Sequence, residues 1–249
     1  MVCFDRMAGT YDVLRPSPPP QVIEALAEEL SDCSLVLEVG VGTGRLAVPL
    51  LERGFRVVGI DLSRKMLDVG RAKGLSHVVV GDVCHLPFRH KAFDAVLAVH
   101  VLHLVRDWPA LLSEVRRVTK EKLVANWRAV EPLSPNLRQV YHESLLERGF
   151  QPGVGNRWED ELARLIPPRR EARILAYEEE TKLDEPLRSL RQREMTVTWD
   201  VPEAMHQAIM RDMESRFGGK SQTFRYEMHL MSWAVDDFTD EALAKVAGV

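Results

Sequence analysis

The chain has 249 residues, of which 45% are hydrophobic and 28% are charged, and its formal net charge is -4 at pH 7. This is a globular composition, and the length suits one large domain or one domain that carries an insertion. The negative charge argues against a broad basic face for nucleic acid. We expect a cytoplasmic protein with reduced thiols, because no apolar run is long enough to span a membrane, the N-terminus does not resemble a signal peptide, and the three cysteines lack CxxC spacing.

The first half of the chain alternates between two kinds of hydrophobic pattern. A proline-rich stretch at residues 16–20 separates an N-terminal arm from a segment with helical spacing at residues 21–30. Short runs rich in valine and leucine then alternate with amphipathic helical segments. This alternation predicts the α/β class, with a doubly wound, mostly parallel sheet and helices on both faces. The expected strands are residues 34–40, 56–63, 77–83, 93–102 and 121–127, and the later helices are residues 45–54, 63–74 and 108–119.

The rhythm changes after residue 127. Helical patterns dominate, and two strands are expected at about residues 172–183 and 223–235. We expect these strands to complete a seven-stranded sheet and the helical segments to form a cap over one edge. The predicted organisation is an arm or lid at residues 1–20, a core at 21–129, and the rest of the same domain at 130–249, with cap insertions at about 130–160 and 184–217.

Three glycines, Gly40, Gly42 and Gly44, lie between the first predicted strand and the next helix. Open parallel sheets bind ligands beyond the carboxyl ends of their strands, and glycines let a ligand approach the backbone closely. Arg45 stands where a dinucleotide fingerprint needs a small residue, and no Lys-Ser/Thr pair follows as in a phosphate-binding Walker loop. A glycine-rich turn without a ligand is the alternative. The coincidence of strand, glycines and helix favours a nucleotide-type ligand.

The pattern E-x-G-x-G-x-G that begins at Glu38 resembles motif I of the class I S-adenosylmethionine-dependent methyltransferases. Within that family the chain looks most like the small-molecule enzymes of the ubiquinone/menaquinone and biotin-pathway group, over roughly residues 1–130. The resemblance implies a Rossmann-like methyltransferase fold, S-adenosyl-L-methionine as cofactor and S-adenosyl-L-homocysteine as product. It also implies methyl transfer to a small or medium organic acceptor by in-line displacement.

The resemblance further implies which residues hold the cofactor. Glu38 would face the cationic amino acid tail, and Asp61, at the end of the second strand, can accept two hydrogen bonds from a ribose diol. Asp82 and the Val83 amide would bind adenine. Met66 packs against the adenine ring or simply belongs to the helix core. The complete predicted cofactor set is Tyr11, Glu38, Gly40, Gly42, Gly44, Asp61, Leu62, Met66, Asp82, Val83 and Val99.

Methyl transfer depends mainly on alignment of donor and acceptor, and a base is needed only when the acceptor must lose a proton. His100, at the end of the fourth strand, is the first candidate base, and Tyr11, in the arm pattern F-D-x-x-A-x-x-Y-D, is the candidate lid and second catalytic residue. His142 is a further candidate, whereas His103 more often packs or caps. Trp127 is a candidate wall for the acceptor. No metal site is predicted.

The sequence does not select an oxygen, nitrogen or carbon acceptor. The N/D-P-P-Y motif of base-modifying enzymes is missing from the fourth strand, where HVLH stands, which speaks against a nucleic-acid substrate. Three alternatives stay open: a protein that binds S-adenosylmethionine without transferring its methyl group, an RNA-directed methyltransferase, and a nucleotide-binding reductase.

Overall fold

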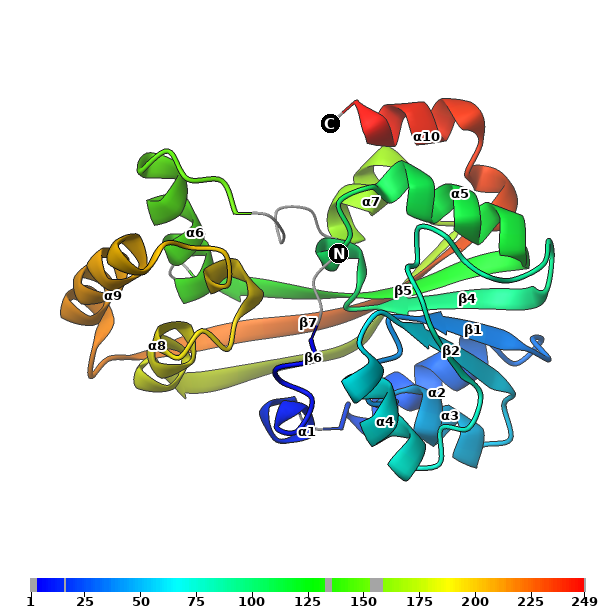
Figure 1. The fold of residues 1–249 in the computed structure, drawn as a ribbon, viewed down its shortest axis with the longest axis horizontal. Coiled ribbons are helices and arrows are strands. Elements are labelled where there is room, and N and C mark those ends of the chain that lie inside the picture. Colours follow the sequence, from blue (N-terminus) through cyan, green and yellow to red (C-terminus); the bar gives the residue numbers. More distant parts are fainter. Residues whose placement is uncertain (1–3, 16, 133–135, 153–158, 249) are drawn as a thin grey trace. The chain divides into compact units, whose positions relative to one another are not determined.

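The central feature of the fold is a seven-stranded sheet with strand order β3-β2-β1-β4-β5-β7-β6 (Figure 1). The computed structural model describes residues 4–15, 17–132, 136–152 and 159–248. Strand β1 pairs in parallel with β2 and β4, β2 with β3, and β4 with β5. Strand β7 is antiparallel. The predicted doubly wound, mostly parallel α/β sheet of seven strands is confirmed.

The elements follow the predicted order, with differences at their ends. Strand β3 is shorter than predicted, β5 extends beyond residue 127, and a helix at the C-terminal end, α10, was not predicted. The strands are β1 (Val36–Val39), β2 (Val57–Asp61), β3 (Val78–Val80), β4 (Phe93–Val99), β5 (Thr119–Pro132), β6 (Arg170–Lys182) and β7 (Ser221–Ala234). The helices are α1 (Tyr11–Leu14), α2 (Pro20–Glu29), α3 (Ala47–Glu52), α4 (Arg64–Ala72), α5 (Trp108–Val118), α6 (Leu137–Glu147), α7 (Glu159–Leu165), α8 (Asp184–Arg191), α9 (Glu203–Phe217) and α10 (Asp240–Ala247), with 3-10 turns η1 (Leu102–Leu104), η2 (Thr196–Thr198) and η3 (Val235–Asp237).

Two hydrophobic cores lie on opposite faces of the parallel strands. Successive side chains of a strand point to opposite faces. In β1, Leu37 accordingly belongs to the core formed with α5, α7 and α10, whereas Val36 belongs to the core formed with α2, α3 and α4. Every residue of β1 and β4 is buried, as expected for central strands covered on both sides. The free ends of these strands therefore offer a rigid base for a binding loop.

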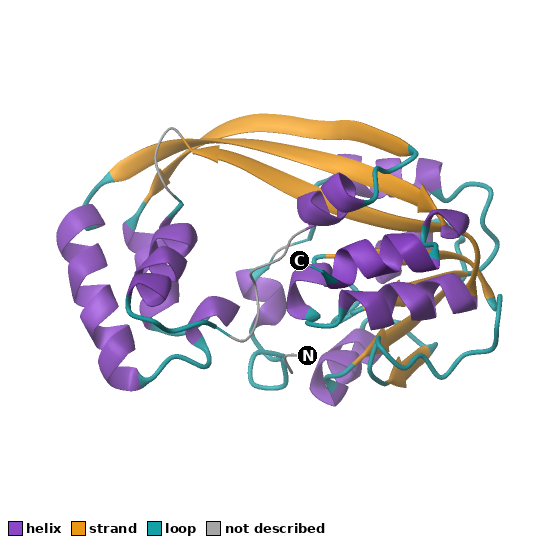
Figure 2. Cartoon of the chain, turned by 90° about the horizontal axis from the view of Figure 1, so that it is seen from above, coloured by secondary structure: helices purple, strands orange, loops and turns teal. Residues whose placement is uncertain are grey.

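The chain divides into two compact units. The first comprises residues 1–127, 157–175 and 228–249, and the second comprises residues 128–156 and 176–227. The long strands β5, β6 and β7 each have residues in both units. Figure 2 shows the strands in orange. The helices predicted within residues 130–160 and 184–217 are present as α6, α8 and α9. Their role as a cap over the acceptor stays a prediction.

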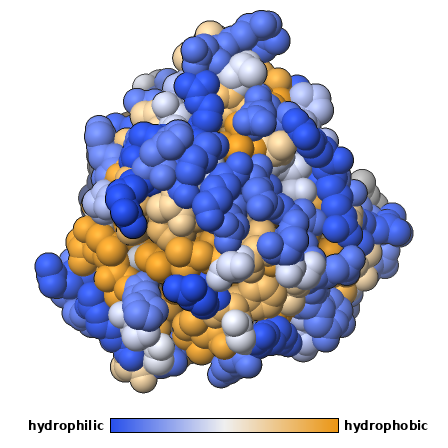
Figure 3. Space-filling model, turned by 90° about the vertical axis from the view of Figure 1, so that its right-hand side faces the viewer, coloured by the Kyte–Doolittle hydropathy of each residue, from blue (hydrophilic) through white to orange (hydrophobic). Residues whose placement is uncertain are grey.

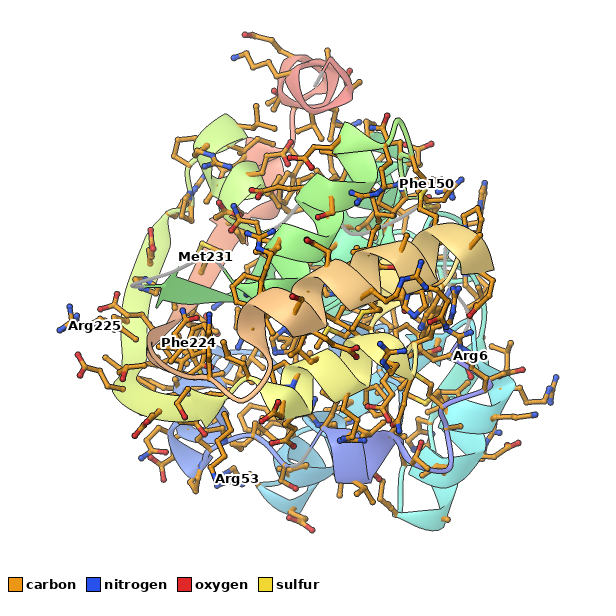
Figure 4. The ribbon with its side chains drawn as sticks, turned by 90° about the vertical axis from the view of Figure 1, so that its left-hand side faces the viewer. Arg6, Arg53, Phe150, Phe224, Arg225 and Met231 are labelled. Atoms are coloured by element: carbon orange, nitrogen blue, oxygen red, sulfur yellow. The ribbon has the colours of Figure 1, made fainter. Side chains whose placement is uncertain are left out.

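The second unit has its own core, which α6, α8, α9 and β7 share. Tyr141 and His206 are both buried in it, and the Tyr141 hydroxyl lies 2.6 Å from Nδ1 of His206. Strand β7 shows the expected alternation: Phe224 is buried in this core, and the neighbouring Arg225 is at the surface (Figure 4). The unit is therefore stabilised by its own apolar packing.

The next features are the hydropathy of the helices and of one face of the surface. Among the described residues, no helix combines the length and apolar character that crossing a bilayer requires. One face is hydrophilic over most of its area and carries an apolar patch (Figure 3). Apolar atoms form more than half of the accessible surface of ordinary globular proteins, so we assign this patch no function.

Candidate functional site

The loop between β1 and α3 depends on its glycines. Gly40, Gly42 and Gly44 have φ angles of 68°, 55° and 78°, a left-handed conformation that residues with a Cβ atom rarely adopt. At Gly40 a Cβ atom would also come within 2.5 Å of Cγ2 of Val101. The loop thus places backbone without side chains at the carboxyl end of β1, where parallel sheets bind ligands.

Asp61 ends β2 and joins this loop to the start of α4. Its Oδ2 accepts a hydrogen bond from the Gly42 amide at 2.9 Å, and its Oδ1 accepts one from the Ser63 amide at 2.8 Å. Burial raises the pKa of Asp61, and the amide bonds act against that rise. Ser63 caps α4 by accepting a hydrogen bond from the Met66 amide, so Asp61 is not needed as the cap. Each carboxylate oxygen has a further lone pair with which to accept a hydrogen bond from a ligand.

Glu38 is a buried acid in the middle of β1. Its side chain lies among apolar strands, and burial raises its pKa to about 8, although the Ala47 amide and the positive charge of Arg45 act in the opposite direction. Within the described part of the chain, Oε2 of Glu38 has no hydrogen-bond partner. A buried acceptor without a partner costs free energy, which a cationic donor from a ligand would recover. The environment of Glu38 therefore fits an ammonium group.

The residues predicted to surround adenine occupy the ends of β3 and α4. Asp82 is half-buried and accepts a hydrogen bond from the Cys84 amide at 2.9 Å. Val83 is buried, and its side chain belongs to the core that includes α5. Met66 is buried on α4, with its Cε 3.2 Å from the position of a Cβ atom built on Gly42. Met66 thus forms part of the wall beside the glycine loop.

The N-terminal arm is held against the glycine loop and the two ends of α4 by two acids that our sequence analysis did not select. Asp5 accepts hydrogen bonds from the Ser63 hydroxyl at 2.5 Å and the Lys65 amide at 3.3 Å. Asp12 accepts from the Thr43 hydroxyl at 2.5 Å and from Nζ of Lys73 at 2.7 Å. Both acids belong to the pattern F-D-x-x-A-x-x-Y-D, so a signal for them was present in the sequence.

Tyr11 lies in this fastened arm. Its ring and the ring of Phe4 form a T-shaped contact, with the ring centroids 5.9 Å apart and an interplanar angle of 87°. The arm thereby brings Tyr11 into the same unit as the glycine loop and Asp61. This placement is compatible with a lid, whose closure stays a prediction.

The carboxyl end of β4 carries Val99, which is buried, and His100. Strand β4 pairs with β1, and Val101 approaches Gly40, so His100 follows a strand that ends beside the glycine loop. His100 is exposed, and desolvation by the surrounding protein lowers its pKa to about 4. The neutral imidazole, which can accept a proton, is the stable form at neutral pH.

A carboxyl group that sequence reasoning missed lies beside His103. Glu159 begins α7 and is only 3% exposed, and its Oε1 lies 3.9 Å from Nδ1 of His103. No local pattern links residue 159 to the end of β4, which explains the omission. The other candidates fall elsewhere: His142 is on α6 in the second unit, and the side chain of Trp127 lies outside the described part of the structure.

Comparisons with known proteins agree with this geometry. Residues 37–122 match the family described as a methyltransferase domain. The chain is 38% identical over 130 residues to a demethylmenaquinone methyltransferase from Thermobifida fusca, which covers 47% of this chain and 55% of the relative. It is 32% identical over 128 residues to a malonyl-[acyl-carrier protein] O-methyltransferase from Serratia marcescens, which covers 47% of each chain. The chain thus spans about half the length of the curated relatives it matches.

Solved structures share the fold over most of the chain. The structure of a putative methyltransferase from Bacillus halodurans has a TM-score of 0.56 and 19% identity, and the match covers 86% of this chain and 98% of that one. At this identity the likeness concerns the fold alone. Residues 37–122 therefore carry a methyltransferase domain, and the glycine loop and the acids at the ends of β2 and β3 lie within it.

Proposed function

We propose that this protein transfers the methyl group of S-adenosylmethionine to a small or medium organic acceptor. The observation that carries the proposal is the pair of acids at the glycine loop: Glu38 has a buried oxygen without a hydrogen-bond partner among the described residues, and Asp61 accepts a hydrogen bond from the Gly42 amide. Their spacing along the family motif supports one ligand with both an ammonium group and a ribose diol. The named relatives act on demethylmenaquinone and on malonyl-[acyl-carrier protein], which supports a small acceptor group.

The residues have distinct roles in this proposal. Glu38 and the backbone carbonyls of Val99 and His100 hold the ammonium, while Asp61 and the neighbouring Leu62 backbone hold the ribose. Asp82, the Val83 amide and Met66 hold adenine, and Tyr11 closes over the donor. The bound cofactor supplies a methyl group activated by a positively charged sulfur. The protein aligns the acceptor and excludes water, and such positioning is worth roughly 7–11 kcal/mol in comparable reactions.

The proposal also covers partners and place of action. The net charge of -4 supports a small-molecule acceptor over nucleic acid. Cys33 and Cys84 are free thiols, which supports a reducing compartment such as the cytoplasm.

The binding part is tested by thermal unfolding with S-adenosylmethionine and S-adenosylhomocysteine. Both ligands are expected to raise the Tm of the wild-type protein, because a ligand that binds the native state stabilises it. Asp61→Ala should abolish the rise and Asp61→Asn, which keeps one oxygen, should reduce it. Asp68→Ala is the matched control, since Asp68 is exposed on α4 and pairs with Arg71. Equal responses in all four proteins would contradict the assignment of Asp61.

The transfer part is tested by product formation with a panel of phenols, naphthols, amines and carboxylic acids. Methylated product in the wild type, and none in Asp61→Ala, is the expected result. Binding of the donor without product from any acceptor would favour a binding protein that lacks transferase activity.

A further inference from the structure

A buried amide lies in β5, opposite the last residue of β4. It belongs to Asn126, whose register partner on β4 is Val99. The side chain of Asn126 is only 1% exposed, and its Oδ1 has no hydrogen-bond partner within the described part of the chain. An oxygen buried in this way gives up its hydrogen bonds to water, which costs free energy unless another donor replaces them. A donor on a bound ligand would supply the missing hydrogen bond.

Asn126 and Glu38 face the same side of the sheet. Val124 of β5 and Val36 of β1 both belong to the core formed with α2, α3 and α4. Side chains two positions apart on a strand share a face, so Asn126 and Glu38, each two residues further on, point to this side. Two buried oxygens without a partner among the described residues thus lie on one face of the parallel strands.

The strand order separates these two oxygens. Strand β4 lies between β1 and β5, so Asn126 and Glu38 are two strand spacings apart, which is about 10 Å. One small group cannot bond to both side chains over this distance. In the proposed function, Glu38 holds the ammonium, and Asp61 and Asp82, at β2 and β3, hold the ribose and adenine. The donor therefore occupies the ends of β1, β2 and β3, and Asn126 lies on the side that remains for the acceptor.

The surroundings of Asn126 on this face are apolar. Val99 and Met228, on the strands to either side of β5, belong to the core on this face. Both residues are 8% exposed, whereas Val124, two residues before Asn126, is fully buried. Apolar surface thus becomes accessible towards the carboxyl end of β4. A molecule bound here would contact hydrocarbon and one amide oxygen.

We propose that Asn126 binds the acceptor, and that its Oδ1 accepts a hydrogen bond from a hydroxyl group on an otherwise apolar molecule. The inference rests on the proposed methyltransferase function and specifies its acceptor. An amide oxygen can only accept hydrogen bonds, so it selects a group that donates one and disfavours a carboxylate. An analogue that lacks the hydroxyl leaves the buried oxygen without a partner and therefore binds more weakly.

The first test measures binding and needs no turnover. Calorimetry compares naphthol with fluoronaphthalene, which has a similar shape but no hydroxyl, in protein saturated with S-adenosylhomocysteine. Wild type should bind naphthol about tenfold more tightly or better. Asn126→Leu and Asn126→Ala should both lose this preference. Thr119→Val is the matched control, because Thr119 is a buried residue at the other end of β5 whose Oγ1 also lacks a partner among the described residues.

Loss of the preference in both Asn126 variants, with the preference kept in Thr119→Val, supports the proposal. A wild-type protein without the preference, or Asn126 variants that keep it, would overturn the proposal. A lower Tm in Asn126→Leu together with a retained preference would assign the amide to the fold alone. The proposed function fails by a different observation, namely a wild-type Tm that does not respond to S-adenosylhomocysteine.

The second test follows methylation of naphthol. Asn126→Leu is expected to raise the KM for naphthol about tenfold, because the hydroxyl loses its partner, while the KM for S-adenosylmethionine stays unchanged. Thr119→Val should leave both values as in wild type. An unchanged KM for naphthol in Asn126→Leu, or a raised KM for S-adenosylmethionine alone, would contradict the placement of Asn126 on the acceptor side.

Discussion

The buried acid of β1 provides a quantitative test of the site. The change is Glu38→Gln, which keeps the shape of the side chain and removes its titration. Burial raises the pKa of Glu38 from its ordinary value of 4.5 to about 8. A pKa difference of one unit corresponds to about 1.36 kcal/mol. The raised pKa therefore means that the charged form of Glu38 is less stable in the native state than in the unfolded chain by about 5 kcal/mol.

The sign of the pH dependence follows from this displacement. Between pH 4.5 and 8 the native state binds a proton that the unfolded state has released, so stability falls as the pH rises through this range. Linkage gives a loss of about 2.5 kcal/mol between pH 6 and pH 9 from this one group. Glu38→Gln should lack this loss. A plot of the free energy of unfolding against pH should therefore have a different slope for the two proteins, and not only a constant offset.

The assay is urea unfolding at pH 6, 7, 8 and 9 without cofactor, with Glu52→Gln as the control, because Glu52 is an exposed acid at the end of α3. Calorimetry gives a second measurement. If the cofactor ammonium pairs with Glu38, binding at pH 7 should release about 0.9 proton in wild type and correspondingly less in the variant. Parallel stability curves for wild type and Glu38→Gln would refute the reasoning about burial. Equal proton release would refute the pairing with the ammonium.

Three further predictions concern other contacts. Gly40→Ala should lower the free energy of unfolding in urea by more than about 2 kcal/mol, because it combines a positive φ with a steric clash. Gly54→Ala should lower it by about 1 kcal/mol, because Gly54 has a φ of 88° but no atom within 4 Å of the added Cβ. Equal losses in the two variants would contradict this prediction. Tyr141→Phe should destabilise the protein by about 1–2 kcal/mol, because it leaves the buried His206 without its 2.6 Å partner, and an unchanged unfolding midpoint would argue against it. Asp12→Asn should speed proteolysis of the arm several-fold while it changes the Tm little, since partly exposed ion pairs contribute below about 1 kcal/mol; a protease-resistant arm would show that this contact does not hold it.

The sequence predicted those features that local patterns encode. Alternation of short apolar runs and helical segments specified the order of elements, and the spacing of Gly40, Gly42 and Gly44 after a strand located the loop whose positive φ angles the structure shows. Asp61 could be placed because it follows directly on β2. Each of these features depends on neighbours within about twenty residues.

Contacts between distant segments were not predictable in the same way. Glu159 lies close to His103 although more than fifty residues separate them in the sequence, and no hydrophobic periodicity predicts this contact. The extension of β5 beyond residue 127 likewise depends on pairing with β7, a strand that begins about ninety residues later. Tertiary pairing decides where a strand ends, whereas composition only suggests where it begins.

The course of β5, β6 and β7 has a practical consequence for protein engineering. Borders between separable domains usually fall in exposed linkers. Here the border between the units falls inside three hydrogen-bonded strands, after residues 127, 175 and 227. Excision of residues 128–156 and 176–227 would cut all three strands and leave shortened strands whose unpaired backbone groups promote aggregation. In chimeras designed to exchange acceptor preference between relatives, the fusion points should therefore lie in the turns outside the strands, or only individual side chains should be exchanged. Either choice keeps the hydrogen-bonded pairing of the three strands intact.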